Sequence, residues 1–385
     1  MNGIRRAVVA AALALLAPLP LAVTAVAAPP QAAAQATWAQ LSLPRPTGHY
    51  AVGRDVLHLV DQHRKDPWVP GAGARQLMVS MYYPAQAGTG GPAPYMSEEE
   101  ARLLVKGQMP GHAIPAKVVS STRTWARDGA RPVRGRFPLV VLSPGHNLPR
   151  ATLSGLAEEL TSHGYVVALV DHTYEAFGVT LPDGRTLPCA CEVVERAGPK
   201  PVVRARVSDI SLALDQLTGR HPAWRHAGLI DPRRIGMAGH SLGGDATALT
   251  MAADHRVRAG ANLDGTFFVH VPAGALRHRP FLLLGNQAQM SPGMPGSWDA
   301  DWPRLDGWKR WLTVAGAHHT GFTDLDLLYS ELGKPTSPGD TTGLREEQIT
   351  RTYLTAYFDQ QLKGRHQRLL DGPSAANPEV TVQHP

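Results

Sequence analysis

Residues 239–244 read Gly-His-Ser-Leu-Gly-Gly, and the stretch lies between a strand-like apolar run and a helical run that starts at Leu242. A serine flanked by glycines at a sharp strand-to-helix turn is typical of a nucleophile elbow. Side chains at Gly239 and Gly243 would clash there, because neighbouring backbone passes close to both. The turn lifts the Ser241 hydroxyl above the sheet and leaves N–H groups free at a helix N-terminus. Ser241 is therefore the candidate nucleophile.

Strand-like and helical runs alternate along the chain on both sides of this turn. The runs at 137–142 and 165–170 are continuously apolar, as expected of parallel strands buried on both faces. Further strands are predicted near 234–238, 259–263, 281–284 and 311–314, with helices near 153–160, 203–217, 242–253 and 349–362. The β-prone runs at 56–60 and 77–83 predict an opening antiparallel hairpin. This alternation predicts an α/β fold with a mostly parallel, doubly wound sheet.

The candidate base is one of two adjacent histidines. A serine hydroxyl is a weak nucleophile and needs a general base, which follows the serine and the acid in the chain order of this kind of site. His318 and His319 come just after the strand-like run that ends near Val314. A loop in that position lies at the carboxyl edge of the sheet, where Ser241 is also expected. Either histidine meets these conditions.

The candidate acid lies between the serine and the histidines, at the end of a late strand. Asp264 follows the apolar run at 259–263 and precedes a glycine. The run at 281–284 ends without an acid, and Asp299 and Asp301 lie in a loop rich in Trp and Pro. Asp264 is therefore predicted to fix the imidazole tautomer and to stabilise the imidazolium without taking the proton itself.

Two backbone N–H groups are expected to form an oxyanion hole. One belongs to Leu242, the residue after the nucleophile, and the other should come from a loop after an early strand. Residues 143–147 read Ser-Pro-Gly-His-Asn and occupy that position. Gly145 permits close approach of the substrate, and the backbone N–H of His146 is the expected second donor.

The N-terminus predicts export. Arg5 and Arg6 precede an apolar run over 7–25 that ends in small residues, which predicts a cleaved signal peptide over residues 1–27 and a secreted protein. A retained membrane anchor is the alternative, but prolines interrupt the run, which is unfavourable for a membrane span.

After the signal, residues 28–45 are predicted to be a linker and residues 46–385 a hydrolase domain. Residues 85–136 form a Gly- and Pro-rich insertion before the core, which is either a lid, a surface-docking element or ordinary surface decoration. The loop that carries Met290, Met294, Trp298 and Trp302 either lines an acyl pocket or packs in the interior.

The charge balance limits the classes of partner. Removal of Arg5 and Arg6 takes Lys and Arg from 38 to 36 against 32 Asp and Glu, a formal net charge of about +4. The sequence has no basic cluster interleaved with aromatic residues, so nucleic acid is not an expected partner. This mild charge permits a weak attraction to anionic surfaces, so transient contact with a lipid surface is compatible with it.

The two cysteines are close together in the sequence. Cys189 and Cys191 are separated by one residue, and export favours their oxidation to a local disulfide, although a bridge over one residue is geometrically tight. A metal or redox pair is the alternative, but two thiols without a nearby histidine make an incomplete site. No metal or organic cofactor is expected.

These motifs together resemble the plasma-type platelet-activating factor acetylhydrolase family and its bacterial relatives. The resemblance covers most of the chain after the signal and runs through residues 46–48 (Pro-Thr-Gly), 81–84 (Met-Tyr-Tyr-Pro), 137–141 (Phe-Pro-Leu-Val-Val), 162–165 (Ser-His-Gly-Tyr) and 239–241 (Gly-His-Ser) to His319. The family places its acid 23 and its histidine 78 positions after the serine, and Asp264 and His319 have this spacing from Ser241. The family motif His-x-x-Phe-x-Asp matches His319, Phe322 and Asp324, so the resemblance selects His319 over His318.

The resemblance implies an α/β-hydrolase fold and hydrolysis of short acyl esters of a phospholipid or related lipid through an acyl-enzyme. The loop at 143–147 departs from the family's more frequent Ser-His-Gly-Leu-Gly, a difference that bears on substrate preference. A secreted cutinase or triacylglycerol lipase is the alternative within the same fold. An inactive hydrolase-fold binding protein is the alternative of another class, and the intact elbow and triad argue against it. The sequence predicts no oligomeric state.

Overall fold

The computed structural model describes residues 38–333, 337 and 339–384. The predicted signal peptide and residues 28–37 of the predicted linker lie outside the described residues. Within the described part of the chain, no helix combines the length and apolar character needed to cross a membrane.

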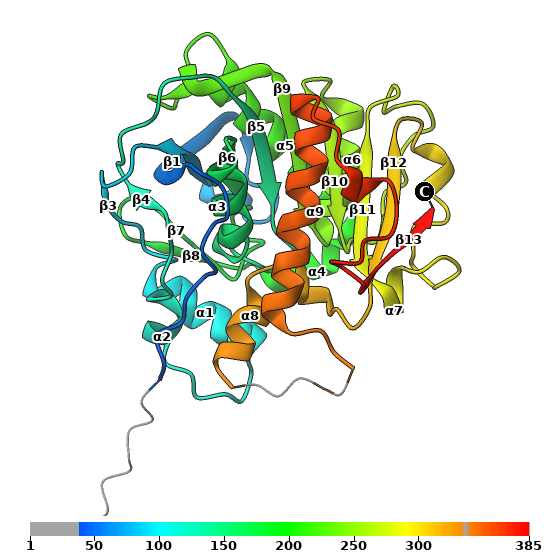
Figure 1. The fold of residues 1–385 in the computed structure, drawn as a ribbon. Coiled ribbons are helices and arrows are strands. Elements are labelled where there is room, and N and C mark those ends of the chain that lie inside the picture. Colours follow the sequence, from blue (N-terminus) through cyan, green and yellow to red (C-terminus); the bar gives the residue numbers. More distant parts are fainter. Residues whose placement is uncertain (1–37, 334–336, 338, 385) are drawn as a thin grey trace, which may run out of the picture. The chain divides into compact units, whose positions relative to one another are not determined.

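A large, mostly parallel sheet carries the fold (Figure 1). In the described residues it has eleven strands in the order β13-β12-β11-β10-β9-β5-β6-β2-β1-β4-β3. The parallel strands are β5 (Phe137–Ser143), β6 (Val166–Val170), β9 (Ile230–His240), β10 (Val257–Leu263), β11 (Phe281–Asn286) and β12 (Lys309–Val314). Antiparallel strands flank them: β1 (Ala51–Lys65) and β2 (Ala74–Ala85) form the predicted hairpin, and β13 (Val380–His384) pairs with β12.

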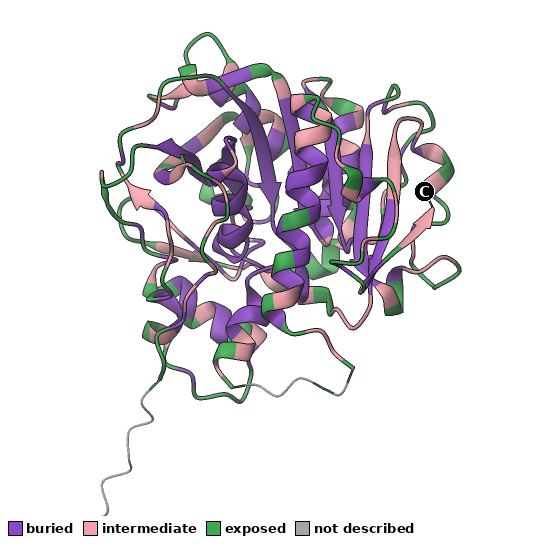
Figure 2. Ribbon diagram, viewed as in Figure 1, coloured by how far each residue is buried: buried purple, intermediate pink, exposed green. Residues whose placement is uncertain are grey.

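Helices cover both faces of this sheet, which confirms the doubly wound prediction. The helices α3 (Ser154–Ser162) and α9 (Gly343–Lys363) pack on the face turned toward the viewer in Figure 1. The helices α5 (Pro199–Thr218) and α6 (Leu242–Ala253) pack on the opposite face. The central strands are therefore buried on both sides (Figure 2), as their continuous apolar sequences require.

Strand register brings the carboxyl ends of the central strands to one edge. Ser143 of β5 pairs with Gly239 of β9, and Leu263 of β10 pairs with both His240 and Leu284. The segments that follow these strands therefore leave the sheet side by side. Ligand sites in open α/β sheets lie at this edge.

The predicted insertion at 85–136 contains four short elements: β3 (Gly91–Pro92), α1 (Glu98–Gln108), α2 (Ala116–Ser120) and β4 (Arg127–Asp128). Its apolar side chains share a cluster with those of α8 (Leu325–Glu331). Two buried carboxylates also anchor the insertion: Asp324 accepts a hydrogen bond from Tyr95 Oη, and Glu158 accepts hydrogen bonds from the N–H groups of Trp125 and Ala126. The insertion is a packed layer of the domain, and its contact with lipid stays a prediction.

Part of the predicted linker belongs to the folded domain. Leu41 and Leu43 are buried among side chains of the insertion, and the Leu43 N–H donates to Arg123 O. Composition alone does not distinguish these residues from a linker, because their partners lie about 80 positions further along the chain.

The remaining elements are short and were not predicted individually. They are β7 (Gly178–Thr180), β8 (Thr186–Pro188), α4 (Cys191–Ala197), α7 (Gln287–Met290) and the 3-10 turns Pro70–Ala72, Arg150–Leu153, Ala227–Leu229, Trp302–Arg304, His319–Phe322 and Arg368–Leu370.

Candidate active site

Ser241 lies on the predicted elbow between β9 and α6. Its φ of 54° is in the region that non-glycine residues rarely adopt, so the nucleophile position is strained. A Cβ on Gly239 would lie 2.2 Å from the Gly243 backbone, and one on Gly243 would lie 2.1 Å from Ser143 O. Both glycines are therefore required by close backbone approach.

A continuous chain of hydrogen bonds joins the three predicted site residues. The Ser241 Oγ is 3.0 Å from His319 Nε2, and His319 Nδ1 is 2.6 Å from Asp264 Oδ2. Since the carboxylate accepts the Nδ1–H, the Nε2 lone pair faces the serine hydroxyl. This is the arrangement in which an imidazole can take the serine proton. The alternative His318 instead faces Asp326 and Asp340, away from the serine.

Asp264 is fully buried at the end of β10 and is fixed by Asn286, the last residue of β11. The Asn286 N–H and side-chain amide donate to Asp264 Oδ1 at 2.6 and 2.9 Å, and the amide also reaches Oδ2 at 2.8 Å. The alternative acids lie elsewhere: Asp299 bonds Ser297, and Asp301 pairs with His270. The sequence shows Asn286 only as a polar residue at a strand end.

His240, the residue before Ser241, anchors the loop that carries His319. Its Nε2–H donates to the His319 carbonyl at 2.8 Å, and the two rings lie 4.7 Å apart. Burial, assisted by the nearby His319, holds the pKa of His240 well below its usual value, so the ring stays neutral. A Cβ on Gly145 would lie 2.6 Å from His240 Nδ1. His240 therefore touches the oxyanion loop as well as the base.

The predicted oxyanion loop is held by a buried arginine that the sequence did not reveal. Arg206 of α5 donates from Nη1 to Pro144 O and from Nη2 to Gly145 O. The Gly145 C=O and the His146 N–H belong to one trans peptide group, in which the two bonds point in opposite directions. Because the C=O faces Arg206, the His146 N–H is directed away from it. Neither the His146 nor the Leu242 N–H donates to another described residue. Both are therefore available to an oxyanion, and that role stays a prediction.

Arg206 is itself fixed by a fully buried ionic network. Its Nε donates to Glu175 at 2.8 Å. In the same network, Arg75 forms ion pairs with Asp209 at 2.7 Å and with Asp66 at 2.8 Å. A second Ser-His-Asp chain lies in this network, since Ser143 Oγ is 2.9 Å from His172 Nε2 and His172 Nδ1 is 2.9 Å from Asp209. Because all three side chains are buried, this chain anchors the start of the oxyanion loop and does not face solvent.

We expect Arg206→Lys to lower kcat by roughly 100-fold with little change in KM, the size of effect seen when one oxyanion donor is lost. A lysine keeps the charge but cannot hold two carbonyls in a fixed fork. The measurement is steady-state hydrolysis of p-nitrophenyl acetate. Arg279→Lys is the matched control, because Arg279 is also buried and bonds the carbonyls of Leu276, Val257 and Met251. Equal kcat values for the two variants would rule out the positioning role.

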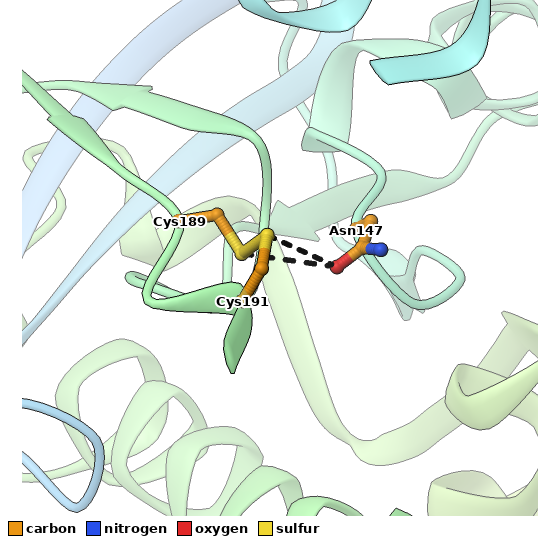
Figure 3. Close-up of a disulfide and its surroundings, with 3 residues drawn as sticks. All are labelled: Asn147, Cys189 and Cys191. Carbon is orange, nitrogen blue, oxygen red and sulfur yellow. Dashed lines mark hydrogen bonds between the residues drawn. A yellow bond between two sulfur atoms is a disulfide. The ribbon is translucent and has the colours of Figure 1, made fainter. Parts of the chain in front are cut away.

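The disulfide between Cys189 and Cys191 lies beside the same loop. Both sulfurs are within 4 Å of Asn147 Oδ1, at 3.8 and 3.9 Å (Figure 3). The Phe177 N–H donates to Asn147 O, and the Cys189 N–H donates to Phe177 O. The structure thus contains the predicted local disulfide and places it against the oxyanion loop, a position that the sequence did not indicate.

The loop rich in Trp and Met packs mainly in the interior. Met290 and Trp298 are buried, and the Trp298 indole N–H donates to Gly265 O at 2.7 Å. Trp298 therefore supports the turn after Asp264 and does not line an acyl pocket. Met294 is exposed. The His319 side chain is 45% exposed and Ser241 is partly exposed, so the chain of three residues opens to solvent.

Two clusters in the described residues have ligand types suited to a metal ion. The set His172, Glu175 and Asp209 is already neutralised by Arg75 and Arg206. The other set is formed by His318, Asp326 and Glu346 and lies beside the loop of the candidate base. Neither touches the Ser241 hydroxyl.

Known proteins resemble this chain in both sequence and fold. The family described as "Platelet-activating factor acetylhydrolase, isoform II" matches residues 35–181. A protein of Arthroderma benhamiae named "Probable 1-alkyl-2-acetylglycerophosphocholine esterase" is 27% identical over 88% of this chain and 92% of its own length. The platelet-activating factor acetylhydrolase of Bos taurus is 24% identical over 78% of this chain and 72% of its own. Among solved structures, the ferulic acid esterase of Streptomyces cinnamoneus is 39% identical, with a TM-score of 0.80 over 90% of this chain and 100% of its own.

Proposed function

This chain belongs to the platelet-activating factor acetylhydrolase family of serine ester hydrolases, and we propose that it is secreted and removes short acyl groups from esters of phospholipid type. The observation that carries the proposed mechanism is the position of His319, which is hydrogen-bonded to both Ser241 and Asp264.

In the proposed reaction, Ser241 Oγ attacks the ester carbonyl carbon while His319 Nε2 takes the hydroxyl proton. The carbonyl oxygen becomes an oxyanion, which accepts hydrogen bonds from the His146 and Leu242 N–H groups. Asp264 stabilises the imidazolium, which then donates its proton to the alcohol oxygen as the ester C–O bond breaks. Water then attacks the acyl carbonyl carbon while the same imidazole takes a water proton. The imidazolium returns this proton to Ser241 Oγ as the bond between Oγ and the acyl carbon breaks, which releases the carboxylic acid and the free serine.

Acetylated glycerophospholipids are the first substrate class because two relatives are named for this chemistry. Esters of ferulic acid are the second class, and the observation that favours them is the 39% identity to a ferulic acid esterase over almost the whole chain. Both classes are compatible with the partly exposed serine and histidine. Polyesters and long-chain triglycerides remain the alternative within the same fold.

The substrate class is tested by comparing kcat/KM of the mature protein on 2-acetyl and 2-palmitoyl glycerophosphocholine, methyl ferulate, trioleoylglycerol and p-nitrophenyl esters from acetate to palmitate. We expect kcat/KM on the 2-acetyl lipid to be at least about 100-fold higher than on the 2-palmitoyl lipid, and kcat/KM on the p-nitrophenyl esters to be highest for short chains. A higher kcat/KM on methyl ferulate would favour the second class, and a preference for long chains would contradict the proposal. Failure of the folded protein to react with a fluorophosphonate would instead favour the binding-protein alternative.

Secretion is supported by the signal-like sequence over residues 1–27 and by the local disulfide, since disulfides persist mainly in oxidising compartments. N-terminal sequencing of the protein from culture medium should find a start near Ala28, and retention of the first 27 residues on a cell-bound protein would contradict secretion.

A further inference from the structure

A cavity of about 310 Å³ lies beside the loop that carries the candidate base. Its described lining includes three carboxylates, those of Asp326, Asp340 and Glu346, and one imidazole, that of His318. No lysine or arginine is among its described lining residues. The cavity therefore concentrates negative charge around a single histidine.

Two separations in this cluster match those between ligands that share one metal ion, both of them from the His318 ring. His318 Nδ1 is 3.3 Å from Asp326 Oδ2 and 3.6 Å from Glu346 Oε1. Nitrogen and oxygen ligands bound tetrahedrally at about 2.0–2.2 Å lie roughly 3.3–3.6 Å from each other. One candidate ligand atom from each of the three residues lies within 4.8 Å of the others.

Two buried carboxylate oxygens in the cluster lack a hydrogen-bond donor among the described residues. Asp326 Oδ2 and Glu346 Oε2 are buried and accept no hydrogen bond within the described chain. The Glu346 side chain is only 1% exposed, so water does not compensate it freely. The other cluster of this kind, at Asp209 and Glu175, differs because buried arginines neutralise it.

Asp340 is in the position of an orienting partner. Its Oδ2 is 3.3 Å from His318 Nε2, on the side of the ring opposite Nδ1. A metal-bound histidine usually donates its other N–H to a carboxylate or carbonyl, which fixes the ring. The cluster therefore offers ligands on one side of the imidazole and an acceptor on the other.

We propose that His318, Asp326 and Glu346 bind one divalent transition-metal cation, of which Zn²⁺ is the representative. The imidazole ligand favours such a cation over Ca²⁺ or Mg²⁺, which take oxygen ligands. The bound ion would join three elements: the loop before His319, the helix α8 and the helix α9. Because it lies outside the hydrogen-bonded chain of Ser241, its role is to stabilise the loop, and it takes no part in the acyl transfer.

A retained proton is the competing explanation of the same cluster. Burial and the adjacent Asp326 raise the pKa of Glu346 to about 9, so a proton can occupy this position in place of a metal. A proton explains the buried oxygens equally well but predicts no saturable metal binding near pH 7.5.

The test is a titration of untagged, chelator-treated mature protein with Zn²⁺, Ca²⁺ or Mg²⁺. Calorimetry measures the binding of each ion, and thermal unfolding measures its effect on Tm. We expect one Zn²⁺ per chain and a rise in Tm of about 4 °C at a free Zn²⁺ concentration near 100 times Kd. Glu346→Gln retains an oxygen acceptor for the His318 N–H, a bond of 2.9 Å, and should weaken Zn²⁺ binding at least tenfold. His318→Ala removes a half-exposed ligand and should do the same.

His270→Ala is the matched control, because His270 pairs with Asp301 at 2.8 Å but has no place in the cluster. This variant should bind Zn²⁺ as the unmodified protein does. Absence of saturable Zn²⁺ binding, preference for Ca²⁺, or undiminished binding by His318→Ala would each overturn the proposal. Circular dichroism establishes whether each variant is folded. If Glu346→Gln does not fold, Zn²⁺ binding by His318→Ala tests the proposal.

Discussion

Ser241→Ala should lower kcat by at least about 10⁵-fold while leaving the fold intact, the loss expected when the nucleophile of a serine triad is removed. The variant keeps the oxyanion donors and the His319–Asp264 pair but has no oxygen to form the acyl-enzyme. Release of p-nitrophenol from the acetate ester measures the effect, with Tm as the measure of folding.

Ser291→Ala provides the matched control for this loss, because Ser291 is a partly buried serine whose hydroxyl, among the described residues, donates only to the Gln287 carbonyl. It should retain kcat within about threefold, as expected of a substitution away from the site. A folded Ser241→Ala protein with the kcat of the unmodified chain would remove Ser241 from the mechanism.

Asp264→Asn is expected to lower kcat by about 10⁴-fold near neutral pH. The asparagine side chain would donate an N–H toward His319 Nδ1, which reverses the tautomer and leaves a proton on Nε2. The Ser241 hydroxyl then faces a donor instead of the lone pair that it needs. A profile of kcat against pH, together with Tm, separates this effect from a loss of folding.

Asp301→Asn controls for the loss of a buried carboxylate that pairs with a histidine, since Asp301 is 2.8 Å from His270. It should keep kcat within a few-fold of the unmodified protein. If Asp301→Asn abolished hydrolysis and Asp264→Asn did not, the acid of the site would have been assigned to the wrong strand.

Long, strongly patterned elements could be predicted from the sequence. Strands such as β5 and β10 are buried on both faces, so their apolar runs identify them without knowledge of their neighbours. The positions of Ser241 and Asp264 follow from the same logic, because each stands directly after such a run. The choice of His319 over His318 came from the family resemblance, and the structure gives its physical reason: only His319 reaches the serine.

The supporting residues could not be predicted in this way. Asn286, Arg206 and His240 act through partners at the ends of other strands, so their roles depend on strand register and on helix placement. A buried arginine in α5 looks like any charged residue within a helical pattern until Pro144 and Gly145 are seen beside it. The burial of Leu41 and Leu43 could not be predicted either, because the side chains that they contact belong to an insertion far along the chain.

The order of the parallel strands has a consequence for how the protein acquires its activity. Ser241, Asp264 and His319 follow β9, β10 and β12, and β11 must be inserted between the last two before the histidine can meet the carboxylate. His319 is 55 positions from Asp264 and 78 positions from Ser241. The chain must therefore lose the conformational entropy of closing these loops before the contacts can stabilise it. A chain that has collapsed and formed its helices but has not completed this edge of the sheet has no nucleophile–base pair. We therefore expect newly synthesised protein to hydrolyse esters only after β9, β10, β11 and β12 have paired.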